Sequence, residues 1–235
     1  MFDIQIINNL VVFLKFSVCT RVNNLIKRSD NMTVIVTTMA NPMVGKTNIA
    51  EARMRTAAEV FERHGGKCRV TRVLFGGMLG GIGMQCATAD FSTAMSVMSD
   101  GMSDPAFEAM MAEREVEPGA EMAGRMIFRT VYGDIAWDTH PVSMARIYRI
   151  ARKNIPAAVA IIEEVDGLSD EINVVGVLPV VNEDMGILHA TYQFKSLKDW
   201  GEKVDEIGMS DAFQAIVTKA NELGTLESSM GYMSI

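Results

Sequence analysis

Cysteine is scarce in this sequence: only Cys19, Cys68 and Cys86 occur among its 235 residues. They form no Cys-x-x-Cys pair and no even-numbered set, which disfavours both a zinc site and a disulfide framework. The scarcity predicts a reducing compartment, the cytoplasm, and no bound metal ion.

Basic residues are also in deficit, with 22 Lys and Arg against 29 Asp and Glu and a formal net charge of −7. Nucleic-acid binding requires a basic face that neutralises phosphates, and no stripe of Lys or Arg runs through the sequence. We therefore expect no nucleic-acid partner and favour a small or apolar ligand.

A long, unbroken apolar run is missing as well. Residues 1–31 include an apolar stretch, but Asn8, Asn9 and Lys15 interrupt it, so it fits neither a signal peptide nor a membrane span. The composition of this segment differs from the rest of the chain, and the first predicted strand begins directly after Met32. We expect residues 1–31 to be a non-native or disordered extension with Met32 as the natural start; an amphipathic surface helix is the alternative.

Apolar residues, in contrast, are plentiful at 49%, and 19 of them are methionines. This is the composition of an ordinary globular protein. Methionine side chains are flexible and polarizable, so they suit an irregular core or, alternatively, an adaptable apolar pocket.

An internal duplication organises the chain after residue 31. Gly-Met-Ser-Asp stands at 101–104 and again at 208–211, and Phe107 or Phe213 follows it. In this alignment the Ala-Thr pair at 87–88 corresponds to the pair at 190–191. The glycine ends one helix, Ser or Asp caps the next, and Phe anchors that helix, so the motif is interpreted as a folding signal without a catalytic role.

Both copies predict the element order β-α-β-β-α-β. The predicted strands cover 33–39, 68–75, 82–89 and 122–132 in the first copy, and 143–150, 172–181, 185–192 and 226–233 in the second. The predicted helices cover 48–63, 91–98 and 105–113, then 156–165, 197–207 and 211–223. We divide the chain into repeat 1 (32–132), a linker (133–142) and repeat 2 (143–235).

This order is ferredoxin-like: both helices of a repeat cover one face of an antiparallel sheet and leave the other face bare. Two such sheets packed face to face cover each other. The predicted fold class is therefore α+β, with two tandem ferredoxin-like βαββαβ repeats whose antiparallel sheets pack as a pseudo-dimeric α/β barrel. Sheet edges are expected to remain at the barrel seams, which favours a homo-oligomer of whole chains.

Two segments of repeat 2, ATYQFKSLKDW at 190–200 and GMSDAF at 208–213, carry a resemblance to the dimeric α/β-barrel superfamily. They look like the strand, helix and short helix of antibiotic-biosynthesis monooxygenases and NIPSNAP proteins. The resemblance implies a superfamily that includes cofactor-free monooxygenases, small-lactone isomerases, haem-binding enzymes and proteins of no known activity. It transfers no functional signature residue by residue.

Candidate site residues follow from the two-residue period of strands. If Phe91 and Phe194 pack into the core between the helices and the sheet, the opposite face of each strand points into the barrel. The residues expected on that face are His189 and Thr191 in repeat 2 and Met84, Cys86 and Thr88 in repeat 1. In this alignment His189 stands where Cys86 stands, so the site is expected where the two repeats differ.

His189 is the catalytic candidate. A neutral imidazole in an apolar barrel suits a general base near neutral pH or an axial ligand of haem iron. The alternative is a structural histidine at the rim that bonds to a neighbouring group.

Arg146 and Tyr148 share one face of the strand 143–150, and they are the remaining ligand-binding candidates. An inward arginine would hold an acidic substrate group or an enolate through two hydrogen bonds. An outward position on a solvated sheet edge is an equally plausible alternative for Arg146. The same two alternatives apply to Arg125 and Arg129 of repeat 1.

Two glycine-containing loops resemble phosphate-binding motifs without the required context. The run at 76–81 (GGMLGG) precedes a strand and not a helix, so we interpret it as a flexible hairpin at the barrel mouth. Gly45-Lys46-Thr47 lacks the first glycine of a Walker motif, because Ala40 occupies that position.

The pair Asp138 and His140 is too small a set for a metal site.

Two functional hypotheses follow. In the first, the barrel binds a small apolar or aromatic molecule between its sheets and acts as a monooxygenase-like enzyme, with no cofactor predicted and haem as the minor alternative. In the second, the barrel is filled by its own side chains and serves as a structural or interaction module. A cavity below about 300 Å³ would favour the second.

Overall fold

The two repeats close into one barrel of eight antiparallel strands in the computed structural model, which describes residues 32–235. The fold class predicted from the sequence is confirmed. The expectations for Cys19 and for residues 1–31 lie outside the described residues.

Repeat 1 places its helices where the apolar periodicity predicts them. Its elements are β1 (Val34–Pro42), α2 (Thr47–Arg63), β2 (Lys67–Phe75), β3 (Ile82–Thr88), α3 (Phe91–Met102), α4 (Pro105–Val116) and β4 (Ala120–Tyr132). Helix α2 buries Ala50, Met54, Ala57 and Phe61, which recur at spacings of three and four residues on one helix face. This apolar stripe holds α2 against the sheet.

Repeat 2 has the same order with two short additions. Its elements are β5 (Val142–Ile150), the 3-10 helix η1 (Arg152–Asn154), α5 (Ile155–Asp166), β6 (Asn173–Val181), β7 (Ile187–Phe194), α6 (Leu197–Lys203), the π-helical turn η2 (Val204–Gly208), α7 (Asp211–Leu223) and β8 (Gly224–Ser234). A π-helical turn accommodates one extra residue within a helix. The second Gly-Met-Ser-Asp motif accordingly lies one residue further from the preceding helix cap, Ser196, than the first motif lies from Asp90.

The repeated motif caps helices, as predicted. The Asp104 carboxylate accepts a hydrogen bond from the Ala106 amide at 2.9 Å, and the Ser210 hydroxyl accepts one from the Phe213 amide at 3.2 Å. The expected role of the glycine is wrong for Gly101, which lies inside α3. A Cβ at Gly101 would lie 2.4 Å from Cδ1 of Phe61, so the glycine lets that ring approach the helix.

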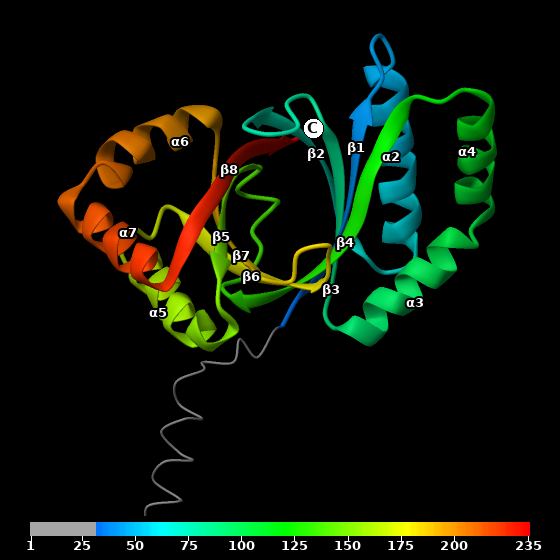
Figure 1. Cartoon of the computed structure of the whole chain (residues 1–235). Coiled ribbons are helices and arrows are strands. Elements are labelled where there is room, and N and C mark those ends of the chain that lie inside the picture. Colours follow the sequence, from blue (N-terminus) through cyan, green and yellow to red (C-terminus); the bar gives the residue numbers. More distant parts are fainter. Residues whose placement is uncertain (1–31) are drawn as a thin grey trace, which may run out of the picture. The chain divides into compact units, whose positions relative to one another are not determined.

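Both seams between the repeats are hydrogen-bonded. Going round the barrel, the strand order is β1-β3-β2-β8-β5-β7-β6-β4, so β2 pairs with β8 and β4 pairs with β6 (Figure 1). The expectation of free sheet edges at the seams is therefore wrong, because strand pairing between repeats uses both edges. Association of whole chains stays a prediction, without that support.

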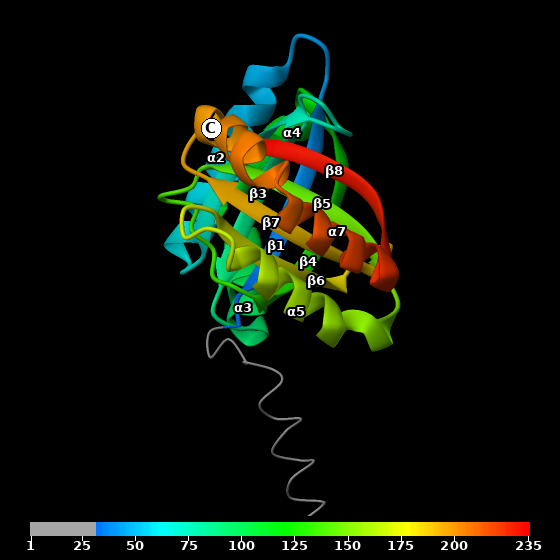
Figure 2. The ribbon, with the colours of Figure 1, turned by 90° about the vertical axis from the view of Figure 1, so that its left-hand side faces the viewer.

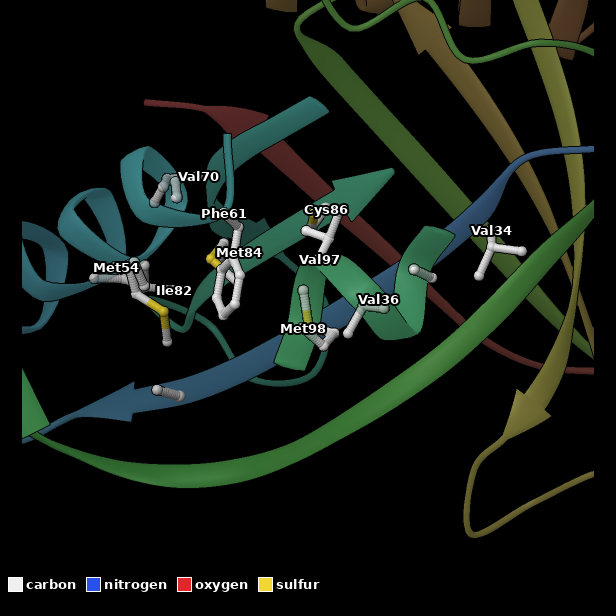
Figure 3. Packing of buried hydrophobic residues seen from close by; sticks show 14 of the residues in the cluster. Val34, Val36, Met54, Phe61, Val70, Ile82, Met84, Cys86, Val97 and Met98 are labelled. Carbon is white, nitrogen blue, oxygen red and sulfur yellow. The ribbon is translucent and has the colours of Figure 1, made fainter. Parts of the chain in front are cut away.

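The helices cover the outside of the barrel, with those of repeat 1 and those of repeat 2 on opposite sides (Figure 1). Figure 2 shows the helices of repeat 2 in front of strands β5, β6 and β7. Each repeat has an apolar core between its helices and its strands, and Figure 3 shows the core of repeat 1. A third cluster, which includes Ile35, Phe128, Trp137 and Val175, faces the barrel interior.

No helix among residues 32–235 has the length and apolar character needed to cross a membrane.

Candidate functional site

A cavity of about 260 Å³ lies inside the barrel, between the sheets of the two repeats. Inward-facing side chains of both repeats form its wall. The apolar part of this wall includes Ile35, Val73, Met126, Phe128, Ile147 and Val177. This volume is just under the usual lower size of a small-molecule site, about 300 Å³, and well above the about 150 Å³ that holds benzene in an engineered cavity. The space suits a ligand built on one ring.

The segment between β4 and β5, residues 133–141, closes one end of the cavity, which we call its floor. Its residues Ile135 and Trp137 line the cavity, and Trp137 is buried. The Gln193 side chain holds this segment in place: Oε1 accepts hydrogen bonds from the Ala136 amide at 2.9 Å and from Asn173 Nδ2 at 2.8 Å. The floor is therefore a fixed, hydrogen-bonded part of the barrel.

Two hairpins contribute to the opposite end of the cavity. Met78, in the glycine-containing turn between β2 and β3, lines the cavity together with Asn182, which follows β6. The turn at 76–81 joins two strands, as the sequence predicts. Met78 has a φ of 61°, a left-handed conformation that is unusual for a residue with a side chain. Local hydrogen bonds fix the turn, with the Gly81 amide donating to the Met78 carbonyl at 2.8 Å.

His189 lies in the wall of this cavity. It stands on β7 opposite Ile147 of β5 and Val177 of β6, and its ring centroid is 4.9 Å from that of Phe128. Its Nε2 is buried and has no hydrogen-bond partner, although buried polar atoms normally have one. Burial lowers the pKa of His189 to about 4, so the imidazole is neutral at neutral pH.

Arg69 is the charged group of the cavity. It comes from β2, is 8% exposed, and donates from Nε to Gln85 Oε1 at 2.7 Å. Its guanidinium lies 4.4 Å from the centre of the Trp137 ring and 5.4 Å from that of Tyr232. Burial lowers the pKa of Arg69 to about 10, which leaves the side chain positively charged at neutral pH.

The structure brings together only two of the predicted site residues. His189 and Thr191 both line the cavity, on the inner face of β7. Their predicted roles in catalysis and binding stay predictions.

The inward orientation expected for Met84, Cys86 and Thr88 is wrong. Met84 and Cys86 belong to the core between the helices and the sheet of repeat 1 (Figure 3), and Thr88 shares their face of β3. The inner face of β3 instead carries Gln85. The physical reason is parity: an alignment error of an odd number of residues exchanges the two faces of a strand.

Arg146 and Tyr148 also point away from the cavity. Tyr148 lies in the core under the helices of repeat 2, and the Arg146 guanidinium lies 5.2 Å from the ring centre of Phe213 in α7. Their neighbours Ala145 and Ile147 line the cavity instead. If Arg146 and Tyr148 bind a ligand, that ligand is not in the barrel interior.

Sequence reasoning missed Arg69, Gln85, Trp137 and Tyr232. The strand alternation places Arg69 and Thr71 on one face of β2, but nothing in the sequence distinguishes that face from the one with Cys68 and Val70. Trp137 lies in a segment without regular structure, for which periodicity gives no orientation. Pairing between β2 and β3, which sets Arg69 opposite Gln85, is visible only in the folded chain.

Metal-ligand side chains do not cluster in the described part of the chain: residues 32–235 contain no group of three or more His, Cys, Asp or Glu with a suitable arrangement. Asp138 forms an ion pair with Lys67, and His140 Nδ1 lies 2.8 Å from the Thr139 hydroxyl.

Comparison with known proteins identifies the fold. No family model and no curated protein sequence matches the chain. An anthrone oxidase-like protein of known structure matches with a TM-score of 0.59 and 11% identity, over 88% of this chain and 92% of the other. A proposed monooxygenase from Fusobacterium nucleatum matches with a TM-score of 0.61 and 7% identity, over 87% and 93%. A proposed chlorite dismutase matches with a TM-score of 0.53 and 10% identity, over 87% and 95%.

The chain therefore shares its barrel fold with these proteins. Identities this low show the fold and leave the activity open.

The expectation that no cofactor is bound needs correction. Chlorite dismutases are haem proteins, and the fold of this chain is shared with a proposed member of that class. The fold therefore gives no ground for excluding a cofactor.

Haem itself does not fit the barrel cavity as this structure shapes it. The unpartnered Nε2 of His189 has the right chemistry for an axial ligand. The surrounding space of about 260 Å³, however, is below the usual size for a drug-like ligand, and a porphyrin is larger than such a ligand.

Proposed function

We propose that this chain is a small-molecule-binding barrel of the monooxygenase-like type, which holds a small apolar or aromatic molecule between its two sheets. One observation carries the proposal: the barrel interior contains a largely apolar cavity of about 260 Å³ with an unpartnered imidazole nitrogen in its wall. A barrel filled by its own side chains would leave no such space.

His189 is the residue that would act on the bound molecule. A neutral imidazole has one nitrogen that can accept a hydrogen bond or a proton, and an acidic group of the ligand would supply it. Phe128, 4.9 Å away between ring centroids, offers an aromatic surface beside it. The similarity in fold to an anthrone oxidase-like protein and to proposed monooxygenases is consistent with this role. A cytoplasmic location stays a prediction.

Filling the cavity is expected to abolish binding of a small apolar probe. Ala145 is buried on β5 and lines the cavity, so Ala145→Leu places three additional carbon atoms in the space. Toluene is expected to bind the unmodified protein with a dissociation constant of about 1 mM or lower, and Ala145→Leu is expected to weaken binding at least about tenfold. Isothermal titration calorimetry measures both values.

The matched control is Ala160→Leu, which makes the same change at an exposed position of α5. It should bind toluene as the unmodified protein does. Equal toluene binding by Ala145→Leu and the unmodified protein would show that the ligand lies elsewhere, and no toluene binding at all would refute the proposed function.

A further inference from the structure

The charge of Arg69 is unusual among the arginines of residues 32–235 because it is buried without a carboxylate partner. Within residues 32–235, no acidic side chain forms an ion pair with Arg69, and neither Asp nor Glu lines the cavity. Arg149 shows the contrast, since it is exposed and pairs with both Asp184 and Glu227. A buried charge is costly unless an opposite charge or hydrogen bonds compensate it.

The compensation that Arg69 receives is partial. Its Nε–H donates to the neutral Gln85 amide at 2.7 Å, which is a good hydrogen bond. Its two terminal nitrogens lie 3.4 and 3.5 Å from the Ser143 hydroxyl, at the outer limit for such a bond. A guanidinium has five N–H donors; the contacts to Gln85 and Ser143 engage three of them and Tyr232 can engage a fourth, so at least one donor remains for a ligand in the cavity.

The aromatic surroundings add a second constraint. The guanidinium lies over the ring of Trp137, and Tyr232 is next to it. These contacts stabilise the charge but do not neutralise it. They also fix the planar fork of Arg69 at the floor of the cavity, where the Gln193 side chain holds the segment that contains Trp137.

We infer that the molecule bound in the barrel carries a planar, two-oxygen anionic group, a carboxylate in its simplest form, and that Arg69 binds this group through its terminal nitrogens. The inference rests on the proposed function and names the class of ligand for it: small carboxylates with one aromatic or other apolar ring. Such an anion supplies the missing opposite charge and the geometry that a guanidinium fork matches best. The ring then extends from the floor along the apolar wall toward Phe128 and His189.

The test compares two probes that differ in charge and hardly in shape, benzoate and benzamide, at neutral pH, where benzoate is ionised. Calorimetric titration of the unmodified protein should give a dissociation constant for benzoate about tenfold or more lower than for benzamide, because charge-assisted hydrogen bonds are about twice as strong as neutral ones. Arg69→Met should remove this preference and leave benzamide binding within about twofold.

Two further variants keep the test decisive. Arg69→Lys retains the charge but not the fork, so it should preserve a preference for benzoate at reduced strength even if Arg69→Met fails to fold. Arg125→Met removes an exposed arginine outside the barrel cavity and should leave the ratio of the two dissociation constants unchanged.

The outcomes separate the inference from the function on which it rests. Equal binding of benzoate and benzamide to the unmodified protein would overturn the anionic ligand class while leaving a small-molecule site in place. A preference for benzoate that survives in Arg69→Met would overturn the role of Arg69. If the unmodified protein binds none of benzoate, benzamide and toluene, the proposed function is overturned as well.

Discussion

His189→Leu is expected to make the stability of the protein less sensitive to acid. Burial holds the pKa of His189 at about 4 in the folded state, against 6.5 for an ordinary histidine. Between these two values the unfolded chain binds a proton that the folded chain does not, so the folded state loses stability as the pH falls. Lowering the pH from 8 to 5 should cost about 2 kcal/mol through this residue alone.

Urea unfolding at pH 8 and at pH 5 measures this effect. The loss of unfolding free energy between the two pH values should be about 2 kcal/mol smaller in His189→Leu than in the unmodified protein. His189→Gln, which is polar but does not titrate, serves as the matched control and should show the same reduction. A loss that is identical in all three proteins would contradict a buried, neutral imidazole.

Gly133→Ala is expected to lower the free energy of unfolding by about 3 kcal/mol or more, because two penalties combine at this position. Gly133 begins the segment that closes the floor of the cavity and has a φ of 66°, in the left-handed region that favours glycine. A Cβ would also lie 2.1 Å from the carbonyl oxygen of Val174 in β6, so the backbone at Gly133 would have to move away from β6.

Gly201→Ala is the control for this substitution. Gly201 lies in α6 with no atom within 4 Å of the position of a Cβ, and alanine favours a helix over glycine. Chemical denaturation should therefore show a stability that is unchanged or raised by up to about 1 kcal/mol. If Gly133→Ala is as stable as Gly201→Ala, the described path of the segment between β4 and β5 is wrong.

The fold could be predicted from the sequence because its signals are local and repeated. Apolar spacing predicts the helices, two-residue alternation predicts the strands, and the Gly-Met-Ser-Asp motif marks equivalent helix caps in both repeats. Closure of the seams was not predictable, because the pairing of β2 with β8 and of β4 with β6 joins residues far apart in the chain.

The site was harder to predict because it depends on which face of each strand points inward. Aligning Ala87-Thr88 with Ala190-Thr191 makes Cys86 the residue of repeat 1 equivalent to His189. The helix caps Asp90 and Ser196 define an alignment of the two repeats that differs by three residues and makes Gly83 the equivalent of His189. Because three is odd, the alignment on Ala87-Thr88 exchanges the inward and outward faces of β3, whereas the faces of β7 are predicted correctly.

The corrected register shows how the two repeats divide the site between them. His189 comes from repeat 2, and its counterpart in repeat 1 is Gly83, where a Cβ would lie 2.6 Å from the sulfur of Met39. Arg69 comes from repeat 1, opposite Gln85 on β3, and its counterpart is Val175, opposite Thr191 on β7. Each repeat therefore supplies polar residues that the other lacks, which a symmetric pair of identical chains would not achieve.

The most direct test of a ligand site between the sheets is to observe His189 while a ligand binds. The chain has three histidines, and the other two, His64 and His140, do not line the barrel cavity, so they serve as internal controls. In a benzoate titration of histidine-labelled protein followed by NMR, the imidazole signals of His189 should shift with the calorimetric midpoint, and those of His64 and His140 should stay in place. Saturation with benzoate, toluene and benzamide in turn without any shift of His189 would contradict a ligand site in the barrel.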